Sequence, residues 1–225
     1  MIKLCIFDLD GTVLDTVHTI AYYGNYALSN NGIEPIDDEE YKYFAGNGAV
    51  NLIKRALRFR NAMTEETFQK VFPVYNAAYN ADTSYLTAPF DGIQETLDAI
   101  KAQGIRMAIL SNKPHFATVG VITSLFGEGY FDCVYGQRED MPIKPDPTAV
   151  HQIMEELGAK PEECLYIGDT GTDMKTGKNA GLYTVGVLWG FRGKEELLDS
   201  GADTIIEKPC QLLDCINAHG KVGAL

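Results

Sequence analysis

Short runs of apolar residues recur along this chain, and each run is followed by a turn signal and then by a helical pattern. The runs that predict strands are Leu4–Phe7, Ile105–Leu110, Phe131–Tyr135, Cys164–Ile167, Tyr183–Val187 and Thr204–Ile206. Continuous apolar strands are typical of a parallel sheet that helices cover on both faces. The helical patterns between them include Gly92–Gln103, Pro147–Leu157 and Thr172–Ala180. Gly104, Gly158 and Gly181 stand where these helices should end, so the alternation predicts a doubly wound α/β fold.

The segment from about Thr16 to Leu86 breaks this alternation. It contains no strand candidate and only helical periodicity, over about 70 residues. An all-helical insert after the first strand predicts a cap domain, because such sheets bind ligands beyond the carboxyl ends of their strands. We therefore expect a core domain of residues 1–15 and 87–225, and a helical cap domain of residues 16–86.

Composition narrows the classes of function. The 225 residues carry 31 acidic and 19 basic side chains, and the formal net charge of −12 argues against nucleic acid or an anionic membrane as the main partner. The five cysteines form no CxxC pair, which favours free thiols in a reducing compartment. No apolar stretch approaches the ~18 residues of a membrane span, and the N-terminal run is too short for a signal peptide. These features predict a cytoplasmic protein.

Two carboxylates follow the first predicted strand. Asp8 and Asp10 lie two residues apart, so strand geometry places them on the same side, and Gly11 permits a tight turn after them. Neighbouring carboxylates repel each other and favour a hard cation such as Mg²⁺, or a shared proton. With the cation present, one carboxylate can act as ligand and nucleophile while the other transfers protons. The alternatives are a solvated turn or an EF-hand fragment, although Thr19 stands where an EF-hand loop needs glutamate.

Three further polar clusters also follow predicted strands, and the strand ends of a parallel sheet share one edge. Ser111 and Asn112 suit hydrogen bonds to phosphate oxygens, and Lys144, in a proline-rich turn, can neutralise a phosphate. Asp169 can bind a cation directly, and Asp173, one helical turn further on, can support it and orient Lys144. Each cluster alone has an ordinary explanation as turn or cap residues, a surface lysine, or an acid in the first turn of a helix.

Taken together and in this order, the four clusters resemble the signature motifs of the haloacid dehalogenase-like hydrolase superfamily: DxDGT, then Ser or Thr, then Lys, then GDxxxD. The inserted helical segment is similar to that superfamily's C1 cap, and the resemblance covers residues 2–215. Within the superfamily, the chain most resembles the phosphoglycolate phosphatase group, through AGNG at residues 45–48, PFDGIQETLDAIKAQGIRMAILSNKP and GDTGTDMKTGKNAG. The resemblance implies a Rossmann-like core and a Mg²⁺-dependent phosphatase of a small phosphorylated metabolite, with phosphoglycolate as the first candidate.

The resemblance also implies roles for individual residues. Asp8 would attack phosphorus and form an aspartyl phosphate. Asp10 would act as general acid and then as general base, and its backbone carbonyl would also bind the metal. Asp169 would complete the metal site that Asp8 and Asp10 begin, with Asp173 beside it. The residues that would bind the substrate are Ser111, Asn112, Lys144 and, in the cap, Asn47.

Other activities are compatible with the same motifs. A β-phosphoglucomutase or a pyrophosphatase would use this scaffold, although no cap residue is identifiable that would shuttle protons for the mutase. A phospho-acceptor signalling domain also combines a doubly wound sheet with an aspartate acceptor, Mg²⁺, Ser or Thr, and Lys. The position of the acceptor after the first strand and the inserted cap favour an enzyme. We expect no nucleic-acid or membrane partner, and a monomer or homodimer.

The remaining conspicuous side chains receive structural interpretations. The tyrosine stripe Tyr22, Tyr23 and Tyr26 is interpreted as packing. The basic residues between Lys54 and Arg60 are interpreted as a solvated helix face, and the four histidines lack the spacing of metal ligands.

Overall fold

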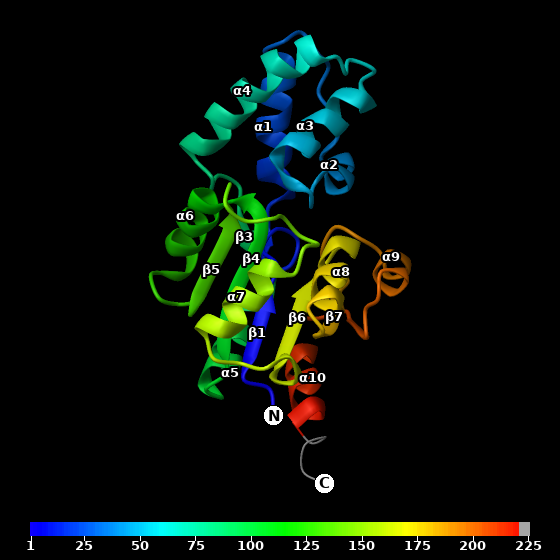
Figure 1. Ribbon diagram of the computed structural model, residues 1–225. Helices are drawn as coiled ribbons and strands as arrows, with labels where there is room; N and C mark the ends of the chain where they lie inside the picture. The colour runs from blue at the N-terminus through cyan, green and yellow to red at the C-terminus, as the bar shows by residue number, and fades with distance from the viewer. Residues whose placement is uncertain (221–225) are drawn as a thin grey trace. The chain divides into compact units, whose positions relative to one another are not determined.

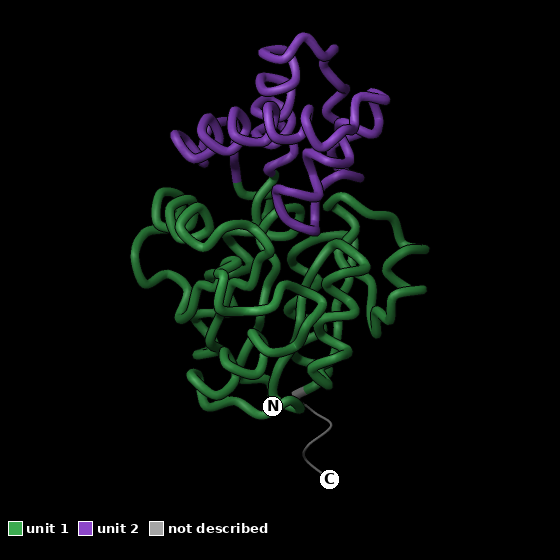
Figure 2. The backbone as a smooth tube through the Cα atoms, turned by 45° about the horizontal axis from the view of Figure 1, so that its top comes forward, with its two compact units in different colours: residues 1–15, 89–225 green, residues 16–88 purple. Residues whose placement is uncertain are grey.

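The computed structural model describes residues 1–220 and divides the chain into two compact units (Figures 1 and 2). One unit, here called the sheet unit, combines Met1–Asp15 with Pro89–Leu225, and the other, the helical unit, is Thr16–Ala88. The last five residues of the expected core domain lie outside the described part of the chain. The chain passes between the units at two short strands, β2 (Leu14–Asp15) and β3 (Ala88–Pro89), which pair with each other.

The sheet unit is built on six parallel strands in the order β5-β4-β1-β6-β7-β8. Their bounds are β1 Leu4–Phe7, β4 Arg106–Pro114, β5 Cys133–Gln137, β6 Cys164–Gly168, β7 Tyr183–Val187 and β8 Thr204–Ile206. Strand β1 pairs with β4 on one side and β6 on the other, so that Phe7 is level with both Ile109 and Ile167. The chain builds outward from β1 to β5, then continues at β6 in the opposite direction, which creates a switch point beside β1.

Helices cover both faces of this sheet (Figure 1). Their bounds are α5 Ile93–Ala102, α6 His115–Phe126, α7 Thr148–Glu156, α8 Gly171–Asn179, α9 Lys194–Asp199 and α10 Gln211–Gly220, with a 3₁₀ turn at Pro161–Glu163. Alternate residues of β1 enter two separate cores. Cys5 and Phe7 share a core with residues of α5, α6 and α10, whereas Leu4 and Ile6 share one with residues of α7. Every residue of β1 is therefore buried, which confirms the predicted α/β architecture.

The helical unit contains the helices α1 Val17–Ser29, α2 Asp38–Phe44, α3 Gly48–Phe59 and α4 Glu65–Ala81. Asp37 and Thr64 cap α2 and α4 by accepting hydrogen bonds from backbone N–H groups of the first turn. Tyr41 is fully buried against α1 at Gly24, where a Cβ would lie 2.5 Å from the tyrosine side chain. Within residues 1–220, no helix is both long and apolar enough to span a membrane.

The strands β1, β7 and β8 have the predicted bounds, and the main difference is at β4. This strand continues beyond its predicted end at Leu110 to Pro114, and its pairing with β5 shifts register between these two residues. Polar side chains follow Leu110, so the apolar pattern ends there, whereas the backbone stays extended as far as Pro114. Gly104, Gly158 and Gly181 have φ values of 73°, 56° and 76°, the left-handed conformation that ends a helix, as predicted.

Candidate functional site

The carboxyl ends of the neighbouring strands β1 and β6 bring Asp8 and Asp169 together. Each aspartate directly follows the last residue of its strand, and the N–H of Asp8 donates to the carbonyl of Ile167 at 2.9 Å. This edge lies at the switch point of the sheet, where the chain connections leave in opposite directions, and sheets of this kind bind ligands at such points. Two carboxylates that are far apart in the sequence thus reach the same place because their strands pair in parallel.

The carboxylate of Asp8 is buried and is held from two sides. Its Oδ1 accepts a hydrogen bond from the N–H of Leu9 at 2.7 Å and forms an ion pair with Lys144 Nζ at 2.8 Å. Burial raises the pKa of Asp8 well above its usual value, the charge of Asp173 raises it further, and Lys144 opposes both effects. The ionised form of Asp8 is therefore costly in this environment, and an added cation would stabilise it.

Asp169 is fully buried and receives a hydrogen bond on each carboxylate oxygen. Thr12 Oγ1 donates to Oδ1 at 3.0 Å, and the N–H of Phe191 donates to Oδ2 at 2.8 Å. Gly11 lets this carboxylate approach the turn after β1, since its φ is +87° and a Cβ there would lie 2.2 Å from Asp169 Oδ2. Burial and the charge of Asp173 raise the pKa of Asp169 to about 7, although both hydrogen bonds lower it.

Lys144 joins Asp8 to Asp173 through one buried ammonium group. Its Nζ lies 2.7 Å from Asp173 Oδ1 and 2.8 Å from Asp8 Oδ1, and it donates to the Leu110 carbonyl at 3.1 Å. Burial by itself would lower the pKa of Lys144, but the charges of Asp173 and Asp8 raise it well above its usual value, so the lysine is cationic. Asp173 Oδ2 also accepts hydrogen bonds from the N–H and the hydroxyl of Thr170, the cap residue of α8. Asp173 thus stabilises the start of the helix and orients Lys144.

Ser111 and Asn112 lie inside the extended end of β4, which corrects the predicted end of this strand at Leu110. Both side chains are buried. Asn112 binds the backbone of Lys144 in both directions, since its Oδ1 accepts from the N–H at 2.9 Å and its Nδ2 donates to the carbonyl at 3.3 Å. Asn112 therefore places the loop that carries the lysine. Ser111 Oγ accepts a hydrogen bond from the N–H of Lys113 at 3.2 Å.

Lys113 is a residue of this site that the motif pattern does not identify. Its side chain is 3% exposed, and its Nζ lies 2.9 Å from Asp10 Oδ1. The signal in the sequence is a lysine at the end of an uncharged run, AILSNKP, where an exposed position is the default interpretation. The side chain of Asp10 is 18% exposed, and its backbone bridges to Leu14 in the turn after β1. Each of the two aspartates after β1 is therefore paired with its own lysine.

Asp8, Asp169 and Asp173 form a compact group of buried carboxylates. Each offers one oxygen, and these oxygens lie within 4.8 Å of one another. Oxygen ligands in this arrangement suit a hard divalent cation such as Mg²⁺. The raised pKa values of Asp8 and Asp169 agree with this, because crowded, buried carboxylates are stabilised by an added positive charge. The carboxylate of Asp10 is outside this group and is paired with Lys113.

Asn47 lies in the helical unit, at the start of α3. Gly46 and Gly48 flank it with φ values of 102° and 80°, a sharp turn that glycine permits. Arg55 holds this turn, since its Nη2 donates to Asn47 Oδ1 at 2.7 Å and its Nη1 donates to the Phe44 carbonyl at 2.9 Å. The interpretation of the basic residues as a solvated helix face is therefore wrong for Arg55, because the guanidinium group is bound to the turn.

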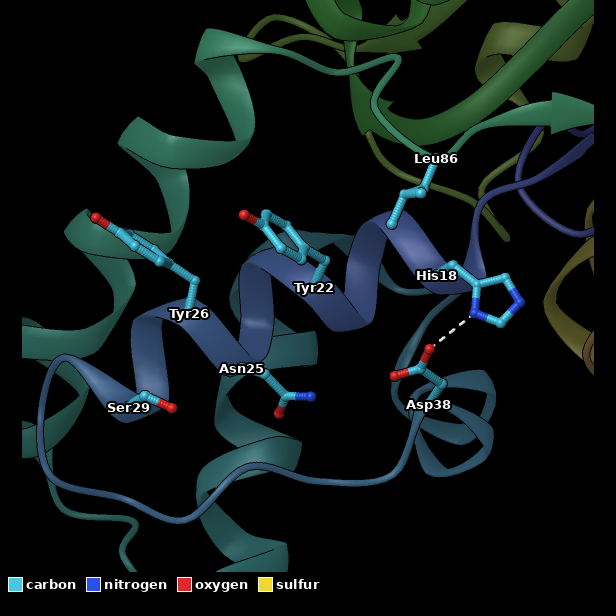
Figure 3. Close-up of a pocket in the computed structure, with 7 residues that line it drawn as sticks. All are labelled: His18, Tyr22, Asn25, Tyr26, Ser29, Asp38 and Leu86. Carbon is cyan, nitrogen blue, oxygen red and sulfur yellow. Dashed lines mark hydrogen bonds and ion pairs between the residues drawn. The ribbon is translucent and has the colours of Figure 1, made fainter.

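The helical unit also has an open groove of about 620 Å³ along α1 (Figure 3). The groove is lined by His18, Tyr22, Asn25, Tyr26, Ser29, Asp38 and Leu86. The His18 ring nitrogen Nδ1 lies 2.7 Å from Asp38 Oδ2, while Tyr22 and Tyr26 are about half exposed, at 47% and 49%. The packing role predicted for the tyrosine stripe is confirmed for the buried Tyr23. It also holds for Tyr22, whose ring centroid lies 5.1 Å from that of Tyr23 and 4.8 Å from that of Tyr85, although the side chain is half exposed.

Comparison with known proteins connects the chain to one enzyme family. The sequence profile of the haloacid dehalogenase-like hydrolase family matches residues 5–187. A phosphoglycolate phosphatase of Aquifex aeolicus is 31% identical over 219 residues, which cover 96% of this chain and 98% of that protein. The solved structure of a candidate phosphoglycolate phosphatase from Lactobacillus delbrueckii subsp. bulgaricus has a TM-score of 0.90 and 30% identity, over 95% of this chain and 98% of that one. A similar candidate from Haemophilus somnus has a TM-score of 0.88 and 26% identity, over 95% and 97%.

Replacing Lys144 with methionine should destabilise the metal-free protein, because Asp8 and Asp173 would remain buried without their shared ammonium group. We expect the free energy of unfolding near neutral pH to fall by about 3–5 kcal/mol. The loss should be smaller at about pH 5, since protonation removes the uncompensated charge and burial already raises the pKa of Asp8. Urea unfolding at both pH values measures the effect.

The matched control is Lys70→Met on α4, which removes an exposed lysine that is paired with Glu66. This change should cost no more than about 1 kcal/mol. An equal loss for Lys144→Met at both pH values would contradict the electrostatic explanation.

Proposed function

The chain belongs to the haloacid dehalogenase-like hydrolase family, and from this premise we propose that it is a Mg²⁺-dependent phosphatase of a small phosphorylated metabolite. The observation that carries the proposal is the arrangement of Asp8 and Asp10, two carboxylates at one strand end that are each bound to a separate buried lysine. Such an arrangement gives two neighbouring carboxylates different tasks, one as nucleophile and one as proton carrier. Both tasks are needed, since phosphate monoesters react extremely slowly without a catalyst.

The proposed reaction has two phosphoryl-transfer steps. In the first, the Asp8 carboxylate attacks phosphorus to form an aspartyl phosphate, the bond to the leaving oxygen breaks, and Asp10 gives that oxygen its proton. In the second, a water molecule attacks the same phosphorus while Asp10 takes its proton. The bond from phosphorus to Asp8 then breaks, which releases inorganic phosphate and restores the carboxylate. Lys144, Ser111 and Asn112 would hold the phosphoryl oxygens in both steps.

The residues that would hold Mg²⁺ are Asp8, Asp169 and, through its backbone carbonyl, Asp10, with Asp173 beside them. The compact group of buried carboxylates supports this assignment, because it supplies hard oxygen ligands and an excess of negative charge. When bound, the cation would reduce the repulsion between an anionic nucleophile and a dianionic substrate. The hydrogen bonds from Thr12 and Phe191 would keep the Asp169 carboxylate oriented.

Phosphoglycolate is the first candidate substrate. This candidate is supported by relatives that match nearly the whole chain and are phosphoglycolate phosphatases. A substrate with a free carboxylate needs a recognition element besides the phosphate site. We assign part of that recognition to the turn around Asn47, whose side chain is fixed by Arg55.

The cytoplasm is the proposed location of this activity. All five cysteines are free thiols, and Cys5, Cys133 and Cys164 are buried. Unpaired cysteines are the usual state in a reducing compartment, which supports the proposal.

A screen of small phosphorylated metabolites with Mg²⁺ should reveal rapid hydrolysis of phosphoglycolate. Asp8→Asn should lower kcat by about 10⁴-fold or more, because an amide cannot serve as the nucleophile. The matched control Asp140→Asn, at an exposed aspartate of the sheet unit, should retain wild-type kcat.

The screen should include glucose phosphates and pyrophosphate. Preferential turnover of these would favour the mutase or the pyrophosphatase over the proposed substrate. A long-lived phosphorylated protein without turnover would support a signalling domain, and full activity of Asp8→Asn would overturn the nucleophile assignment.

Chelation with EDTA should abolish this activity, and added Mg²⁺ should restore it. Mg²⁺ should bind more tightly as the pH rises, because Asp169, whose pKa is raised to about 7, must lose its proton to become a ligand. Each carboxyl that must ionise should change the affinity by up to about tenfold per pH unit below its pKa. Titration calorimetry in two buffers of different ionisation heat measures both affinity and proton release. Activity that persists in EDTA would refute the metal requirement. Asp169→Asn should weaken Mg²⁺ binding and reduce its pH dependence, with the raised pKa of Asp8 accounting for the remainder.

Asn47→Ala should raise KM for phosphoglycolate by about tenfold, because one hydrogen-bonding group of the turn is lost. KM for p-nitrophenyl phosphate, which lacks the carboxylate, should change much less. Asn80→Ala on α4, which removes an exposed asparagine, is the matched control. Steady-state kinetics on both substrates measure the difference, and equal changes in KM would remove the turn from substrate recognition.

A further inference from the structure

Lys113 and Asp10 form an ion pair that is largely removed from solvent. The Lys113 side chain is 3% exposed and the Asp10 side chain 18%, with Nζ 2.9 Å from Oδ1. An ammonium group is costly to remove from water unless a partner of opposite charge compensates it. The surface pair Lys70–Glu66, with side chains 63% and 80% exposed, is under no such constraint. Burial therefore makes the contact between Lys113 and Asp10 a fixed feature of the fold.

The backbone of Lys113 is held at both its N–H and its carbonyl. The N–H donates to Ser111 Oγ at 3.2 Å, and the carbonyl accepts from Thr118 Oγ1 at 3.2 Å. Gly136 on β5 allows close packing here, since a Cβ at that position would lie 2.7 Å from the Lys113 carbonyl oxygen. The ammonium group thus extends from a rigid strand end, so its position is set by the sheet and does not depend on a flexible loop.

We propose that Lys113 is a positioning residue that reserves Asp10 for proton transfer, an inference that rests on the proposed function. By binding Oδ1, Lys113 fixes the orientation of the carboxylate. Oδ2 then gives its proton to the leaving oxygen in the first step and takes a proton from water in the second.

The same contact separates Asp10 from the cation-binding carboxylates. A divalent cation held by Asp8 and Asp169, with Asp173 beside them, would attract the Asp10 carboxylate as well, and a carboxylate engaged with the cation would no longer exchange protons. The ammonium group of Lys113 competes for Asp10 and keeps its carboxylate outside that group. The two buried lysines thus assign the two aspartates after β1 to different tasks.

The leaving group of the substrate provides the first test. An alkyl phosphate such as phosphoglycolate needs a proton on its leaving oxygen, whereas the p-nitrophenolate of p-nitrophenyl phosphate leaves without one. Lys113→Met should therefore lower kcat/KM for phosphoglycolate by about 10²-fold and for p-nitrophenyl phosphate by less than about tenfold. Asp10→Asn should show the same asymmetry, and adding Lys113→Met to it should cause no further loss. Lys113→Arg, which keeps the charge, should restore part of the difference.

Binding of Mg²⁺ to the substrate-free protein provides the second test. Calorimetry should show tighter binding to Lys113→Met than to the wild type, because the released carboxylate of Asp10 joins the ligands. A purely structural role would loosen the site and weaken binding. Lys70→Met is the control for the loss of a lysine in general, and circular dichroism establishes that each variant is folded. If Lys113→Met does not fold, Lys113→Gln takes its place in both tests.

Different results identify which assignment fails. The role of Lys113 would be overturned if Lys113→Met lost kcat/KM equally on both substrates, if the double variant lost more than Asp10→Asn, or if Lys113→Met bound Mg²⁺ more weakly. The proposed phosphatase function would still stand in these cases, provided that the wild type turns over its substrate. A wild-type protein that hydrolyses neither ester would overturn the proposed function, and the role of Lys113 would fall with it.

Discussion

The ammonium group of Lys144, buried between Asp8 and Asp173, is the interaction on which the rest of the site depends. The aspartates after β1 and β6 gather at one edge of the sheet, and their burial raises the pKa of Asp8 and of Asp169. Such crowding is tolerable only where positive charge is supplied nearby. Lys144 supplies it at the centre of the group and Lys113 at its side. With all four aspartates ionised, the two lysines leave a formal charge of −2, which one divalent cation would balance. The net charge of −12 for the whole chain is therefore compatible with an anionic substrate, because the local balance of charges decides what the site attracts.

The fold supplies this balance by fixing each charge from a different element. Strand β1 lies between β4 and β6, so the ends of all three strands meet at one edge. Asn112 on β4 binds the backbone of Lys144, while Thr170 binds Asp173 at the start of α8. Both residues contribute to the site by fixing the position of a charged group, Lys144 in the case of Asn112 and Asp173 in the case of Thr170. These hydrogen bonds tie the charged groups to the end of β4 and to the cap residue of α8, so that elements of the fold set their positions.

The helical unit contributes a shaped turn and none of the four aspartates. Its turn around Asn47 is shaped by two glycines of positive φ and is held by Arg55. In our proposal the sheet unit performs the phosphoryl transfer and the helical unit selects among phosphate esters. A scaffold divided in this way can change its substrate without disturbing the four aspartates, which is how one fold supports several activities.

The sequence by itself determined the strands of the sheet and the order of the charged clusters. Strands such as Leu4–Phe7 and Tyr183–Val187 are recognisable because burial on both faces requires continuous apolar residues, and Gly104 ends its helix because glycine readily adopts positive φ. Only the tertiary structure decided which charges pair. A lysine that follows a polar dipeptide is expected on the surface. Lys113 is instead buried against Asp10, because β4 stays extended beyond its apolar run. Tyr26 is the converse case, since it was expected to pack and is half exposed. Burial and charge pairing depend on contacts between residues that are distant in the sequence, and a local sequence pattern does not specify which distant residues come into contact.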